Sequence, residues 1–163
     1  MSKFAASLAV AAVLLSASAI AETAKPTVVL VHGAFADSSS WNGVTRILQK
    51  DGYNVVAAAN PLRSVSGDAA YVSSVVNNIK GPVVLVGHSY GGQVITNAAR
   101  DTNNVKSLVY VAAFAPDAGE AAADLAGKFP GGTLGQALAT PVKLADGSVD
   151  LSIVRAKFHQ QFA

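Results

Sequence analysis

The chain has 163 residues, of which 51% are hydrophobic and only 13% are charged. This composition is typical of a folded domain with an apolar core, and it excludes an intrinsically disordered chain. The 12 basic and 10 acidic side chains nearly balance, so no basic surface for nucleic acid or for an anionic membrane is expected. The lack of cysteine excludes disulfides, thiolate nucleophiles and cysteine metal sites.

The first 21 residues have the pattern of a secretory signal peptide. Lys3 precedes an alanine-, leucine- and valine-rich run, and Ala19-Ile20-Ala21 supplies the small residues of a cleavage site. An uncleaved anchor is the alternative, but serines interrupt the run, whereas a spanning helix needs about 20 apolar residues. We therefore expect cleavage after Ala21, export to the periplasm or the medium, and no stable membrane insertion afterwards. Cleavage would leave 11 of the 12 basic side chains against all 10 acidic ones.

The next part of the chain alternates between short apolar runs and amphipathic stretches, as buried parallel strands and their crossover helices do. Four apolar runs predict strands, at residues 28–31, 54–59, 83–86 and 105–112. Three amphipathic stretches predict helices between them. The first carries Trp41, Val44 and Leu48, the second has Val72, Val75, Val76 and Ile79 on one face, and the third, after Ser89, carries Val94, Ile95 and Ala98. The pattern predicts an α/β fold with a doubly wound, mostly parallel sheet.

The character of the sequence changes after Asp117. The stretch that follows is rich in alanine and glycine and contains no further buried strand. A small hairpin is expected about Asp146-Gly147. Val154, Phe158 and Phe162 stand four residues apart, which predicts an amphipathic helix at the end of the chain.

Gly87-His88-Ser89-Tyr90-Gly91 fits the pattern G-x-S-x-G of a nucleophile elbow. Such an elbow is a strained turn that holds a serine hydroxyl clear of the backbone between a strand and a helix. Its two glycines let neighbouring backbone approach closely. A predicted strand precedes the motif and a predicted helix follows it, as this motif requires. The alternative is a serine that only caps a helix. We predict that Ser89 is the catalytic nucleophile.

A serine nucleophile needs two backbone N–H donors for the oxyanion of its tetrahedral intermediate. One donor belongs to the residue after the serine, here Tyr90, and the other to a loop after an earlier strand. His32-Gly33-Ala34 ends the first predicted strand, so we expect the N–H of Ala34 to be the second donor. A simple chain turn is the other interpretation of His32-Gly33.

Three motifs in order resemble the α/β-hydrolase superfamily: residues 29–35 followed by Trp41, residues 86–92 and residues 111–117. Within it they are similar to a branch of small esterases and hydroxynitrile lyases. The resemblance implies a sheet of the α/β-hydrolase type that lacks its C-terminal strands. Residues 22–117 would be the N-terminal part of the core, and residues 118–163 the start of a lid.

The resemblance also implies a function, the hydrolysis of a small-molecule ester through an acyl-enzyme on Ser89. Hydroxynitrile lyase-like chemistry and a non-catalytic binding module are the alternatives. No dinucleotide, Walker or metal-ligand pattern occurs, so neither a cofactor nor a metal is expected. The sequence leaves the oligomeric state open.

The triad of this superfamily runs in the order Ser, then Asp or Glu, then His, with the last two residues after later strands. Those strands are not recognisable in this sequence, so we expect a truncated and inactive chain. His32 resembles the histidine that shapes the oxyanion loop, and His88 is expected to pack under the elbow. His159 could act as base only within about 3 Å of the Ser89 hydroxyl.

Overall fold

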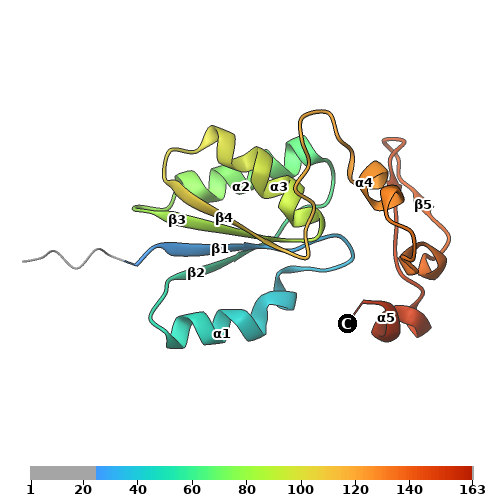
Figure 1. The fold of residues 1–163 in the computed structure, drawn as a ribbon, viewed down its shortest axis with the longest axis horizontal. Helices are drawn as coiled ribbons and strands as arrows, with labels where there is room; N and C mark the ends of the chain where they lie inside the picture. Colours follow the sequence, from blue (N-terminus) through green and yellow to red (C-terminus); the bar gives the residue numbers. More distant parts are fainter. Residues whose placement is uncertain (1–24, 163) are drawn as a thin grey trace, which may run out of the picture.

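The computed structural model describes residues 25–162, and the predicted signal peptide lies outside them. Helices and strands alternate along the first two thirds of the chain, and short elements follow (Figure 1). In chain order they are β1 (Thr27–Val31), η1 (Ser38–Trp41), α1 (Asn42–Lys50), β2 (Val55–Ala58), α2 (Val65–Asn77), β3 (Val83–His88), α3 (Tyr90–Ala98), η2 (Ala99–Asp101), β4 (Val105–Val111), α4 (Ala122–Lys128), η3 (Leu134–Ala137), β5 (Val142–Lys143), β6 (Val149–Asp150) and α5 (Arg155–Gln161).

The centre of the molecule is a parallel sheet with the strand order β2-β1-β3-β4. All five residues of β1 are buried, because neighbouring strands flank it on both sides and helices cover both faces. Figure 1 shows α1 on one face and α2 with α3 on the other. The predicted doubly wound parallel sheet is therefore confirmed.

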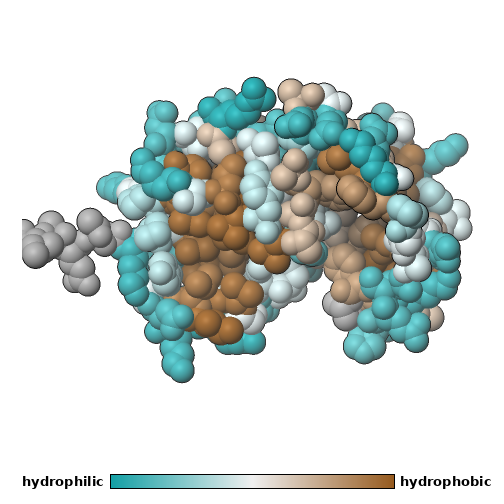
Figure 2. All heavy atoms as spheres, in the orientation of Figure 1, coloured by the Kyte–Doolittle hydropathy of each residue, from teal (hydrophilic) through white to brown (hydrophobic). Residues whose placement is uncertain are grey.

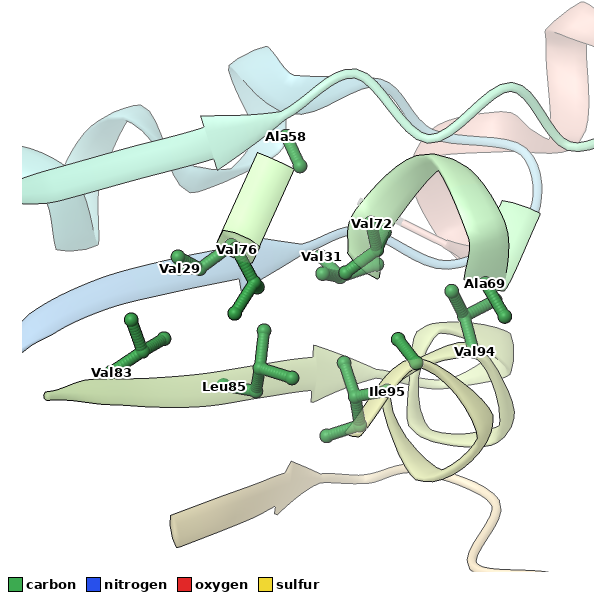
Figure 3. Packing of buried hydrophobic residues seen from close by; sticks show 11 residues of the cluster. Val29, Val31, Ala58, Ala69, Val72, Val76, Val83, Leu85, Val94 and Ile95 are labelled. Carbon is green, nitrogen blue, oxygen red and sulfur yellow. The ribbon is translucent and has the colours of Figure 1, made fainter. Parts of the chain in front are cut away.

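Successive side chains of a strand point to opposite faces of its sheet, so β1 contributes to two cores. Val29 and Val31 belong to the cluster beneath α2 and α3, which Figure 3 shows from close by. Val28 and Leu30 belong to the opposite cluster, with Trp41. Packing on both faces fixes the carboxyl end of β1, from which the predicted oxyanion loop departs.

Local caps decide where two helices begin. Helix α2 begins at Val65, seven residues before Val72, the first apolar residue that marks it in the sequence, since the Ser64 hydroxyl accepts a hydrogen bond of 3.1 Å from the N–H of Gly67. Trp41 ends the short helix η1, whose first turn the Asp37 carboxylate caps through a 2.7 Å bond from the N–H of Ser39. Hydrogen bonds from Ser39 hold the pKa of Asp37 below its ordinary value.

Strand β4 is the last strand of the sheet, with β3 as its neighbour on one side. Val109, Tyr110 and Val111 near its end are 41%, 38% and 41% exposed, respectively. Figure 2 shows apolar residues gathered on this side of the molecule. An open edge with apolar side chains favours aggregation.

Residues 118–162 lie beyond the carboxyl ends of the strands, at the right of Figure 1. The predicted hairpin is present, with β5 and β6 antiparallel on either side of Asp146-Gly147. The predicted C-terminal helix is present as α5. None of the helices within residues 25–162 combines the length and the apolar character needed to cross a membrane.

Candidate active site

Ser89 lies between β3 and α3, where the sequence places the nucleophile elbow. Its backbone has φ 53° and ψ −123°, a conformation that residues other than glycine rarely adopt. Such a residue costs on the order of 1–3 kcal/mol and persists only where the surroundings enforce it. The side chain makes no hydrogen bond to the helix it precedes, so the alternative of a simple cap does not describe this serine.

Three glycines permit the close packing that enforces this turn. A Cβ atom built on Gly87 would lie 2.5 Å from the carbonyl oxygen of Gly91. One built on Gly91 would lie 2.5 Å from the carbonyl oxygen of Val31 in β1. A Cβ atom on Gly92 would collide with the carbonyl oxygen of Phe114. The start of α3 therefore lies against backbone on several sides, and side chains larger than hydrogen do not fit there.

The predicted oxyanion loop adjoins the elbow. A Cβ atom on Gly33 would lie 2.8 Å from Ser89 Cβ and 3.3 Å from its hydroxyl oxygen. Ala34 follows directly and borders the same cavity as Tyr90. The N–H of Tyr90, at the first position of α3, has no acceptor within its own helix. The structure thus brings together the residues predicted as nucleophile and oxyanion donors.

Two of the three histidines contact groups other than Ser89. His32 is 2% exposed, and its Nδ1 is 2.9 Å from the carbonyl oxygen of Gly33. Because a carbonyl oxygen can only accept, Nδ1 carries the proton of this bond. The His88 ring packs edge-on against Trp41 and Phe162, with centroids 6.4 and 6.5 Å away.

The third histidine, His159, lies on α5, which reaches the elbow through the Phe162 that follows the helix. Besides its contact with His88, the Phe162 ring lies edge-on to Phe35 of the oxyanion loop, with centroids 6.2 Å apart. The C-terminal segment therefore contacts both parts of the predicted site.

A cavity of about 580 Å³ opens between the oxyanion loop, the β2–α2 loop and the β5–β6 hairpin. Its lining combines apolar side chains with one pair of opposite charges: Ala34, Phe35, Leu62, Arg63, Ser64, Tyr90, Val142, Val149, Asp150, Leu151 and Ser152. Arg63 and Asp150 pair across the cavity at 2.9 Å. A cavity of this size is typical of small-molecule sites.

Sequence reasoning missed a carboxylate beside the elbow. Asp68, in the first turn of α2, is completely buried. Its Oδ2 accepts a 2.8 Å bond from the Tyr90 hydroxyl, and its Oδ1 accepts a 3.0 Å bond from the N–H of Arg63. Burial, and then the hydrogen bond to Asp68, raise the pKa of the Tyr90 phenol above its ordinary value.

A second missed residue is Asn60, whose side-chain amide donates a 3.2 Å bond to the carbonyl oxygen of His32. This bond ties the end of β2 to the oxyanion loop. Asp37 caps η1 and is not among the residues that line the cavity. Within the described residues, no group of three or more His, Cys, Asp or Glu side chains is placed to hold a metal ion.

Known proteins resemble this chain in sequence and in fold. The chain is similar to a carbendazim hydrolyzing esterase of Nocardioides sp. (strain SG-4G), with 33% identity over 105 residues. That alignment covers 56% of this chain and 43% of the relative. The chain therefore spans less than half the length of this curated relative.

Solved structures support the same fold. An extracellular alpha/beta-hydrolase from a Paenibacillus species, described as sharing structural and functional homology with tobacco salicylic acid binding protein 2, superposes with a TM-score of 0.58 at 25% identity. The match covers 69% of this chain and 50% of that structure. A pyrethroid hydrolase, PytH, superposes with a TM-score of 0.65 at 20% identity, over 83% of this chain and 59% of that one. Because residues 28–160 match the family described as the alpha/beta hydrolase family, the chain belongs to that family.

Proposed function

We propose that this chain carries the nucleophile and the oxyanion hole of an esterase that acts on a small uncharged ester. The Ser89 oxygen attacks the ester carbonyl carbon, its proton passes to a base, and the alcohol leaves. Water then hydrolyses the acyl-enzyme and restores the serine. The N–H groups of Tyr90 and Ala34 stabilise the oxyanion. The observation that carries the proposal is the strained backbone of Ser89, packed against Gly33 at the carboxyl end of β3.

The base limits what the isolated chain can do. A serine hydroxyl is a weak nucleophile until a neighbour takes its proton. His32 bonds to a carbonyl oxygen and His88 packs between aromatic rings, so neither is placed as a partner for Ser89. We therefore expect the 163-residue chain to react slowly unless His159 on α5, the third histidine, takes the proton.

The cavity supports an uncharged substrate with an apolar group. Most of the lining side chains are apolar, and the one pair of charges, Arg63 and Asp150, is satisfied internally. A charged substrate would have to separate this pair or lose its own hydration without a partner. The relative from Nocardioides is named as a carbendazim hydrolyzing esterase, which supports ester hydrolysis.

The C-terminal segment serves this site as the beginning of a lid. Its hairpin closes one side of the cavity, and Phe162 contacts the oxyanion loop. Of the residues that the structure describes, 25–117 form the matching part of the core. A signal peptide over residues 1–21 exports the chain, in keeping with the extracellular relative from Paenibacillus.

The test compares the full chain with Ser89→Ala in two assays, hydrolysis of p-nitrophenyl acetate and labelling by a fluorophosphonate probe. An exposed serine on β4 gives the matched control Ser107→Ala. Labelling and hydrolysis that depend on Ser89 and not on Ser107 support the proposal. Equal ester hydrolysis by the wild type and Ser89→Ala, without labelling, would overturn it and leave a non-catalytic, hydrolase-like domain. A further variant, His159→Ala, shows whether α5 supplies the base.

A further inference from the structure

The carboxylate of Asp68 lies in an unusual place for a charged group. It is completely buried on the face of α2 that also buries Ala69 and Val72. Burying a carboxylate is costly unless donors replace its water. Both of its oxygens are used, one by the hydroxyl of Tyr90 and the other by the N–H of Arg63.

These two donors belong to the two segments that border the cavity beside the elbow. Tyr90 follows Ser89 directly and begins α3. Arg63 stands in the β2–α2 loop, next to Leu62, whose φ of 58° is also rare for residues other than glycine. A single buried carboxylate thus joins the elbow, the pocket loop and α2, and each of its two donors follows a strained backbone position directly in sequence.

We propose that Asp68 is a positioning residue of the oxyanion hole, which holds the backbone N–H of Tyr90 in place through the Tyr90 side chain. The ring of Tyr90 packs against the core cluster, and the hydroxyl at its far end is fixed by the 2.8 Å bond to Asp68. The side chain is therefore held by packing and by its hydroxyl, and both contacts restrain the main chain at Tyr90. The importance of Asp68 for catalysis rests on the proposed function, whereas its effect on the elbow does not.

A purely local role is the competing explanation. An acidic residue in the first turn of a helix interacts favourably with the helix dipole, and the bond from the Arg63 N–H could serve α2 alone. The two explanations differ in one respect. Only the positioning role depends on the hydrogen bond from the Tyr90 hydroxyl to Asp68. Tyr90→Phe removes this hydroxyl and keeps the ring, while Tyr71→Phe, on the exposed side of α2, is the matched control.

The first measurement tests the contact. In protein labelled with ¹³C at tyrosine Cζ, the Tyr90 signal is identified by its absence from Tyr90→Phe. Asp68→Asn replaces the charged acceptor by a neutral amide, so this signal shifts while those of the other three of the four tyrosines stay in place. A Tyr90 signal that does not respond to Asp68→Asn would exclude the bond in solution.

The second measurement tests the elbow, through the amides of Gly92 and Phe114, which donate to the Ser89 carbonyl at 3.0 and 3.1 Å. We expect their hydrogen exchange to be roughly tenfold faster in Asp68→Asn and in Tyr90→Phe, and no faster in the double variant, because both changes break one path. In the control Tyr71→Phe, the hydrogen exchange of these two amides should be the same as in the wild type. Exchange that accelerates in Asp68→Asn alone, or in neither variant, overturns the proposal.

Fluorophosphonate labelling of Ser89 separates this inference from the proposed function. Labelling should slow roughly tenfold in both variants, less than the hundredfold that a displacement of about 1 Å can cost. Full-rate labelling of Asp68→Asn in a folded protein would overturn the catalytic part of the inference. If the wild type is not labelled at all, the proposed function fails, and the amide exchange alone decides the role of Asp68 at the elbow.

Discussion

Replacing Gly91 with alanine tests how closely the elbow helix packs against the sheet. In a helix, the change from glycine to alanine normally stabilises a protein by about 0.4–1 kcal/mol, because alanine has less backbone freedom to lose on folding. Gly91 lies in α3, where the new Cβ atom would be 2.5 Å from the carbonyl oxygen of Val31 and 3.0 Å from that of His32. Both oxygens belong to backbone that packing on two sides holds in place.

The magnitude follows from how far α3 must move. Relieving the contact requires a displacement of roughly 1 Å between α3 and β1, and such overpacking costs about 1–3 kcal/mol. At the middle of these two ranges the gain from alanine offsets about a third of the cost, so we expect Gly91→Ala to destabilise the chain by about 1 kcal/mol. Gly43, in α1, has nothing within 4 Å of its hypothetical Cβ atom. Gly43→Ala should therefore be stabilising.

Urea unfolding followed by circular dichroism measures both variants. The midpoint should fall for Gly91→Ala and rise for Gly43→Ala, with equal slopes, so that the midpoints report stability alone. Labelling of Ser89 should also slow in Gly91→Ala, since Tyr90 moves with α3. A Gly91→Ala protein as stable as Gly43→Ala would refute the close approach of α3 to β1, and with it the reason for a glycine at this position.

Two further predictions concern the strain and the lid. Ser89→Gly should raise the free energy of unfolding by about 1 kcal/mol, because glycine adopts a positive φ without the Cβ penalty; an unchanged or lower stability in urea would show that the turn is not strained. Arg63→Ala and Asp150→Ala should each lower stability by at most about 1 kcal/mol at low salt, and by nothing in 1 M salt. In a double-mutant cycle their effects should not add; simple additivity would mean that the two side chains do not interact in solution.

The sequence was a good guide to the sheet, because burial leaves a strong pattern there. Strands covered on both faces are continuously apolar, and each of the four apolar runs corresponds to a strand of the structure. The beginning of α2 was not evident from the sequence, because Ser66 and Gly67 in its first turn interrupt the apolar pattern after Val65. The buried face of the helix begins at Asp68, whose charge hides it in the sequence.

The sequence shows where the predicted site residues lie in the fold, because they stand next to recognisable strands. It does not show the buried carboxylate that contacts one of them. Ser89 and Tyr90 share one motif, and the oxyanion loop directly follows an obvious strand. Asp68 precedes Val72 by four residues and so lies on the buried face of its helix, which could have been noticed as a charge within an apolar stripe. Its partner Tyr90 stands 22 residues away, and no sequence spacing indicates a contact that only the packing of α2 on α3 creates.

The packing of Trp41 on the elbow gives this protein a built-in optical reporter. Trp41 is the single tryptophan of the chain, it is 8% exposed, and its ring meets His88, the neighbour of Ser89. The His88 ring also contacts Phe162 of the C-terminal segment. Anything that displaces these rings, from a bound ester to a moving lid, changes the surroundings of one indole, so its emission can follow events at the elbow in the unmodified chain.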